Sequence, residues 1–154
     1  MLIIARILIL LIIFLPIALL IAGQLGMLRG SPPTALGVTD GKLAAAHEKT
    51  QNTVCSQARN DYSQIAPLAA GQAASAWPKL KDVVAAMPGA KIIEERPNYL
   101  RTEFQTQWLK FVDDVEFYRD DTDNSIHMRS ASRLGRKDFG VNRARLEAIR
   151  ARIS

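Results

Sequence analysis

The chain has almost no cysteine, few aromatic residues and very little charge in its first 28 residues. Its one cysteine, Cys55, excludes an intramolecular disulfide framework. Its two histidines stand in neither HxH nor HExxH spacing, so the common zinc motifs are excluded. Aromatic residues make up 6% of the chain and are not interleaved with the basic ones, so we expect no nucleic-acid partner. The apolar fraction of 48% disfavours intrinsic disorder.

Charge is distributed unevenly along the 154 residues, which are enough for one modest domain. The net charge is +5, yet residues 1–28 contain a single charged side chain, Arg6. Residues 29–128 carry a net −2, and residues 129–154 carry a net +6. The excess positive charge therefore lies in the last part of the chain.

The N-terminal segment is a long apolar run. Residues 7–28 contain one polar side chain, Gln24, and one proline, Pro16. A helix of this length crosses a hydrocarbon core of about 30 Å, and transmembrane helices tolerate proline. We therefore predict that residues 1–28 are a transmembrane anchor.

A cleaved secretory signal is the competing interpretation of this segment. Arg6 would be its basic region and Ile21-Ala22-Gly23 a weak cleavage tripeptide, but the apolar run continues past the tripeptide. Arg6 and the amino terminus favour a cytoplasmic N-terminus, although Arg29 follows the other end of the run. We expect a single-pass membrane protein whose domain lies on the exported, periplasmic side.

The rest of the chain reads as a linker and one domain. Residues 29–41 are rich in Pro, Gly and Ser, which is typical of a tether. Residues 42–154 are predicted to form one domain, which begins with extended coil and a short helical turn over residues 42–57.

Two helices are predicted in this domain. The first covers residues 69–87, with Pro78 in its first turn. Its apolar face consists of Trp77, Leu80, Val84 and Met87. The second covers residues 143–153, with Asn142 as its cap. Its apolar stripe consists of Leu146, Ile149 and Ile153.

Alternating apolar and polar residues between the helices predict strands. They cover residues 91–95, 99–106, 111–118 and 125–131. The expected fold is α+β, a small antiparallel sheet of about four strands with helices covering one face.

The third of these strands contains three acidic residues, Asp113, Asp114 and Glu116, which strands disfavour. Alternation places Asp113 on the side of the apolar residues, where a carboxylate must be paired or protonated. The candidate partners are arginines: Arg101, Arg129, Arg133 and Arg145. We interpret these residues as an internal lattice of ion pairs between the sheet and the C-terminal helix.

The segment over residues 129–145 combines glycines, hydroxyls and guanidiniums with the start of a helix, an arrangement that can bind an anion. The candidate anion- or partner-binding residues are Arg133, Gly135, Arg136, Lys137, Gly140, Asn142 and Arg145. The alternative is structural: the glycines form turns, Asp138 and Asn142 cap the helix, and Arg133 and Arg145 neutralise the acidic strand.

Catalytic chemistry has weaker support. A small hydrolase or metal-dependent enzyme would use Asp113, Asp114 and His127, but no metal-ligand spacing is present. The turn at Asp121 lacks the glycine and glutamate of an EF-hand loop, and Cys55 has no recognisable catalytic partner. We expect no catalytic residue, no metal and no cofactor.

Two late motifs resemble the domain-of-unknown-function 1499 family. They are the strand FVDDVEF at residues 111–117 and the pattern RSxSRxGxxDxGxNxxR at residues 129–145. The resemblance covers residues 36–153 and implies an uncharacterised bacterial or plastid domain that often follows a hydrophobic segment. It implies no catalytic residue.

These observations predict a non-catalytic, membrane-anchored domain. It would bind an anionic ligand, an anionic lipid surface or a protein partner at the membrane, with Arg136 and Lys137 as exposed contact residues. An accessory subunit of a membrane complex is a second possibility with the same features.

Overall fold

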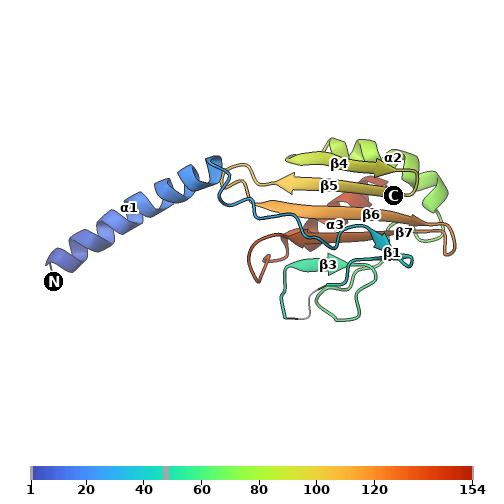
Figure 1. Ribbon diagram of the computed structural model, residues 1–154, viewed down its shortest axis with the longest axis horizontal. Coiled ribbons are helices and arrows are strands. Elements are labelled where there is room, and N and C mark those ends of the chain that lie inside the picture. The colour runs from blue at the N-terminus through green and yellow to red at the C-terminus, as the bar shows by residue number, and fades with distance from the viewer. Residues whose placement is uncertain (1, 47–48, 154) are drawn as a thin grey trace.

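The computed structural model describes residues 2–46 and 49–153. Helix α1, Leu2–Gln24, projects away from the rest of the chain (Figure 1), and its side chains from Ile3 to Ile21 are exposed. Within the described part of the chain, Ile3–Gln24 is the helix long and apolar enough to cross a membrane. A membrane anchor and a signal sequence both fit this helix.

The domain is built on a five-stranded antiparallel sheet with the strand order β3-β7-β6-β5-β4. Its strands are β3 (Thr53–Cys55), β4 (Ala90–Arg96), β5 (Tyr99–Gln105), β6 (Val112–Asp120) and β7 (Ser125–Ser132). A separate two-stranded sheet pairs β1 (Val38–Thr39) with β2 (Lys42–Leu43). The prediction of four strands was therefore too low, and residues 42–57, predicted to be coil, contain β2 and β3.

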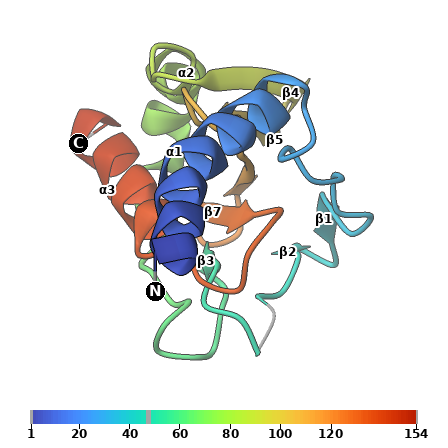
Figure 2. The ribbon, with the colours of Figure 1, turned by 90° about the vertical axis from the view of Figure 1, so that its left-hand side faces the viewer.

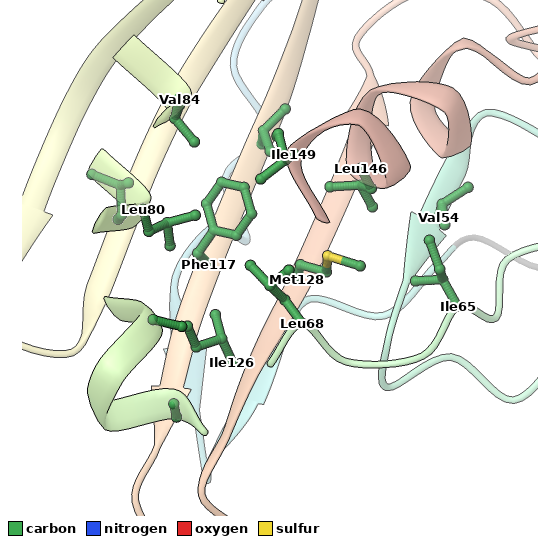
Figure 3. Packing of buried hydrophobic residues seen from close by; sticks show 14 of the residues in the cluster. Val54, Ile65, Leu68, Leu80, Val84, Phe117, Ile126, Met128, Leu146 and Ile149 are labelled. Atoms are coloured by element: carbon green, nitrogen blue, oxygen red, sulfur yellow. The ribbon is translucent and has the colours of Figure 1, made fainter. Parts of the chain in front are cut away.

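Helices α2 (Ala73–Ala85) and α3 (Val141–Ile153) contribute to the main apolar core. Leu80 and Val84 of α2 and Leu146 and Ile149 of α3 share one buried cluster with strand residues such as Phe117 (Figure 3). Burial of these side chains supplies the main driving force for folding.

Both predicted helix starts differ from the structure. Helix α2 begins at Ala73 instead of residue 69, because Ala69 and Gly71 both have positive φ and so interrupt helical backbone. Pro78 is the sixth residue of α2, not a first-turn residue. Helix α3 begins at Val141, two residues before the predicted start.

The face of the five-stranded sheet that lies away from α2 and α3 also carries buried residues. The chain between α1 and β3 passes along the side of the sheet away from α2 and α3 (Figures 1 and 2). Leu43 packs there with Tyr99 and Cys55 in a second apolar cluster, and the Gly37 amide donates a hydrogen bond to Glu116 Oε1 at 2.7 Å. The segment predicted to be a tether thus lies against the sheet.

Candidate functional site

The three acidic residues of β6 point to alternate faces of the sheet. Asp113 shares its face with Val115 and Phe117 of the main core and is 6% exposed. Its Oδ2 accepts a hydrogen bond of 2.5 Å from Arg145 Nη2 of α3. This ion pair joins the sheet to the C-terminal helix.

Asp114 lies on the other face and is fully buried. Arg133 donates to both of its oxygens, from Nε to Oδ2 and from Nη2 to Oδ1, each at 2.8 Å. Arg133 Nη2 also donates to Glu103 Oε1 at 2.5 Å, and Arg101 Nη2 lies 3.4 Å from Asp114 Oδ1. The hydrogen bonds to Asp114 and Glu103 raise the pKa of Arg133 above its usual value.

Glu116 is the third acid, also fully buried. Its Oε2 accepts from Arg129 Nη1 at 3.0 Å, and its Oε1 accepts from the Tyr99 hydroxyl at 2.8 Å. Burial, together with the negative charge of Glu116, raises the pKa of Tyr99. Because each buried acid meets an arginine, these groups form an internal ion-pair lattice.

The loop from β7 to α3 is fixed by a second polar network, centred on Asn142. Its Oδ1 accepts from Ser130 Oγ and Arg145 Nη1, and its Nδ2 donates to Ser132 Oγ and Asp138 Oδ2. Asn142 is the second residue of α3, and its side-chain oxygen accepts from other side chains and not from a helix amide, so its prediction as the helix cap was wrong.

Asp138 caps α3 in its place. Its Oδ1 accepts from the Gly140 amide at 3.0 Å and its Oδ2 from the Asn142 amide at 3.2 Å. Burial alone would raise the pKa of Asp138, but hydrogen bonds from Tyr62 and from these amides hold it below its usual value. The loop is therefore a preformed turn.

This network decides which of the predicted anion-binding residues are accessible. Arg133, Asn142 and Arg145 are committed to internal partners. Gly135 and Gly140 have φ of +89° and +85°, as turns require. The exposed cations that remain are Arg136 and Lys137, which form no ion pair within the part of the chain that the structure describes.

The structure does not bring Asp113, Asp114 and His127 together. Asp113 pairs with Ser132 in the sheet, whereas His127 pairs with Tyr118, five residues farther along β6. Five strand residues correspond to about 17 Å. The proposed catalytic or metal cluster of these three residues is therefore wrong.

His127 has other neighbours, near the turn between β6 and β7. Its Nε2 lies 3.2 Å from Asp123 Oδ2, and its Nδ1 lies 3.2 Å from Ser56 Oγ. Ligand atoms of Asp120, Asp123 and His127 lie within 4.8 Å of one another, which is close enough to hold a metal ion. Sequence spacing did not reveal this group, because the hairpin turn brings it together.

The end of the sheet next to α1 carries the residues that sequence reasoning missed. Gln24 Nε2 donates to the Trp108 carbonyl at 3.0 Å, and a Cβ on Gly23 would lie 2.6 Å from the Leu109 carbonyl oxygen. The end of α1 thus rests on the loop between β5 and β6. Gly30, just beyond α1, packs closely on Arg133 at the start of the loop between β7 and α3.

Two aromatic side chains are exposed on these loops. Trp108 is 68% exposed and Phe139 is 93% exposed. Phe139 has φ of +53°, a strained backbone conformation for a bulky residue. Both loops lie at the end of the sheet from which α1 leaves (Figure 1). Isolated aromatic residues in loops have no periodicity, so the sequence does not indicate a role for them.

A cavity of about 1050 Å³ opens at the same end. It lies between the turn before β4, the end of β5 and the start of α3. Four cationic side chains and one acidic side chain line it: Arg29, Lys91, Lys110, Arg145 and Glu103.

Comparison with known proteins identifies a family that covers most of the chain. The family described as "Protein of unknown function (DUF1499)" matches residues 44–153. No curated protein and no solved structure matches the chain.

Proposed function

Because the chain belongs to the DUF1499 family of proteins of unknown function, we propose its role from geometry: a non-catalytic, membrane-anchored domain that docks on an anionic lipid surface. One observation carries the proposal. The exposed cations and the exposed aromatic side chains share the end of the sheet from which the apolar helix α1 leaves.

Helix α1 supports a position at the membrane. Its apolar stretch Ile3–Gln24 has 22 residues, which extend about 33 Å at the helical rise and match a hydrocarbon core of about 30 Å. Because Gln24 and Gly23 contact the loop between β5 and β6, a membrane crossed by α1 meets the domain at that loop. We place the N-terminus on the cytoplasmic side and the domain on the exported, periplasmic side, since Arg6 precedes most of the apolar run.

The charge at this end is suited to anionic head groups. Arg136 and Lys137 are exposed on the loop after β7, which ends beside the start of β6 because Ser132 pairs with Asp113. Lys110 lies on the neighbouring loop. Basic side chains near an anionic membrane surface each contribute about 1 kcal/mol.

Trp108 and Phe139 add an apolar contribution. Tryptophan favours the membrane interface, where its ring is in apolar surroundings and its indole N–H remains hydrated. Full burial of an apolar side chain contributes roughly 1.5–3 kcal/mol. Phe139 is held in the turn after Asp138 and is almost completely exposed, so its ring is available for insertion into an interface.

Hydrogen–deuterium exchange of the full chain in lipid nanodiscs tests the proposal. We expect the loops over residues 106–110 and 134–140 to be protected in nanodiscs with anionic lipid and less so in zwitterionic ones. The double substitution Arg136→Ala/Lys137→Ala should reduce this protection while the sheet remains protected. Lys42→Ala/Lys79→Ala is the matched control, because both lysines are exposed and lie outside these loops.

Equal exchange in both nanodiscs, with no effect of the loop substitutions, would contradict lipid docking. If the loops are protected by a co-purifying membrane protein regardless of lipid charge, the domain is instead an accessory subunit of a membrane complex. Mild detergent extraction followed by identification of bound proteins separates the two functions.

A further inference from the structure

The cavity of about 1050 Å³ next to α1 has walls of two kinds. One part is apolar, formed by Phe104, Met87 and Val141. The other part is cationic and contains Lys91 and Lys110. A site with both kinds of wall fits a ligand that has an anionic group and an apolar part.

The cavity is built by rigid elements. A Cβ on Gly89 would collide with the Gln105 carbonyl oxygen. The turn before β4 can therefore approach the end of β5 this closely only because residue 89 is a glycine. The Arg145 guanidinium stacks over the Phe104 ring, 4.8 Å from its centroid, and is held there by Asp113. The side of the cavity toward the sheet is therefore preorganised.

The remaining cations are available for a ligand. Lys91 and Lys110 form no ion pair with any residue that the structure describes. Lys110 is half-buried, and its backbone φ of +58° is one that residues other than glycine rarely adopt. Glu103, the acidic residue of the cavity, is already neutralised, because it pairs with Arg133 at 2.5 Å and lies 3.9 Å from Arg29.

We propose that this cavity binds the head group of one anionic phospholipid, with Lys91 and Lys110 contacting its phosphate. The proposal rests on the membrane docking described above, because the ligand comes from the bilayer that α1 crosses. Arg29 lines the cavity five residues after α1 ends, so the site is next to the bilayer surface. The apolar walls favour a lipid over free phosphate, for which they offer no contact.

Native mass spectrometry of the full chain in mild detergent tests this. Phosphatidylglycerol, phosphatidylethanolamine or inorganic phosphate is added separately, and the bound fraction is measured. We expect phosphatidylglycerol to bind, and Lys91→Glu/Lys110→Glu to weaken it by about ten-fold or more. Lys42→Glu/Lys79→Glu is the control, since it changes the net charge equally at exposed sites outside the cavity.

A second variant keeps the test decisive if the charge reversal prevents folding. Ala144→Trp adds bulk on an exposed, cavity-lining position of α3 without altering charge, and it should also reduce lipid binding. Unchanged phosphatidylglycerol binding by a folded cavity variant would overturn the proposal. So would equal binding of phosphatidylethanolamine, or binding of inorganic phosphate alone.

The two proposals fail separately. Loop protection in anionic nanodiscs without specific phosphatidylglycerol binding would leave the docking function standing and remove the cavity site. Cavity-dependent phosphatidylglycerol binding in detergent without loop protection in nanodiscs would remove the docking function, and with it the bilayer as the source of the ligand, while lipid binding by the cavity itself would stand.

Discussion

Arg133 donates two hydrogen bonds of 2.8 Å to the Asp114 carboxylate, and the side chains of Arg133 and Asp114 are 3% and 0% exposed. In this bidentate arginine–carboxylate geometry both hydrogen bonds are charge-assisted, which makes them stronger than hydrogen bonds between neutral groups. It connects the chain after β7 to the middle of the sheet, and so fixes where the exposed loop with Arg136 and Lys137 begins.

Loss of this ion pair should destabilise the domain strongly. Arg133→Met leaves the buried Asp114 with only the longer contact to Arg101, so we expect the free energy of unfolding to fall by about 3–5 kcal/mol. Chemical denaturation of the full chain in detergent measures it. Arg136→Met, on the same loop but exposed, is the control and should leave stability unchanged. Equal effects of the two substitutions would refute the structural role of the pair.

The cap of α3 predicts a specific dependence on acid. The pKa of Asp138 is lower in the folded chain than its ordinary value of 3.8, so the folded state binds the proton less readily than the unfolded state. Its stabilising contribution is therefore present above about pH 4 and is lost as pH falls through the folded pKa. Asp138→Asn should reduce stability at neutral pH and make less difference in acid. A difference in the free energy of unfolding between the unsubstituted chain and Asp138→Asn that stays constant at all pH values would contradict this.

All three tyrosines should lose their phenolic proton at a higher pH than a free tyrosine does. Burial and the hydrogen bond to Asp138 raise the pKa of Tyr62 to about 12. Burial is also the largest cause of the raised pKa of Tyr99 and of Tyr118. We expect little tyrosinate absorbance at pH 10 in the folded chain and normal titration in concentrated guanidinium chloride. Stability from the neutral phenols is present below about pH 10 and is lost above it.

Gly89 and Gly71 form a matched pair, because both have φ of +76°. A Cβ on Gly71 would meet nothing within 4 Å, whereas one on Gly89 would collide with the Gln105 backbone. Gly71→Ala should therefore cost about 1–2 kcal/mol from backbone strain alone. Gly89→Ala should cost clearly more, as measured by thermal or chemical unfolding. Similar losses would show that the approach of this turn to β5 is not tight.

The sequence was most informative where side chains alternate. The strand over residues 99–106 was predicted almost to its observed ends, because Leu100, Thr102 and Phe104 are buried and the residues between them are not. The short strand β3 was missed, since its three residues are buried on both faces and show no alternation. Three residues are too few for a periodicity to appear.

The site was harder to predict than the fold. The arginines near the acidic strand were evident, but pairing Arg145 with Asp113 and Arg133 with Asp114 requires the strand register and the position of α3. The sequence offered both Asn142 and Asp138 as caps of this helix, and only the loop geometry gives the role to Asp138. The role of Trp108 follows from its contact with the end of α1, and local sequence patterns carry no information about that long-range contact.

The depth of Trp108 in a membrane tests the central claim most directly. In a Trp77→Phe background, Trp108 is the one remaining tryptophan, and Trp108→Phe leaves Trp77 as the matched control. The full chain is placed in anionic nanodiscs whose lipids carry bromine near the head groups, and tryptophan fluorescence is recorded. We predict strong quenching of Trp108, weakened by Arg136→Ala/Lys137→Ala, and little quenching of Trp77. Quenching of Trp108 no stronger than that of Trp77 would contradict docking of this end of the domain on the membrane.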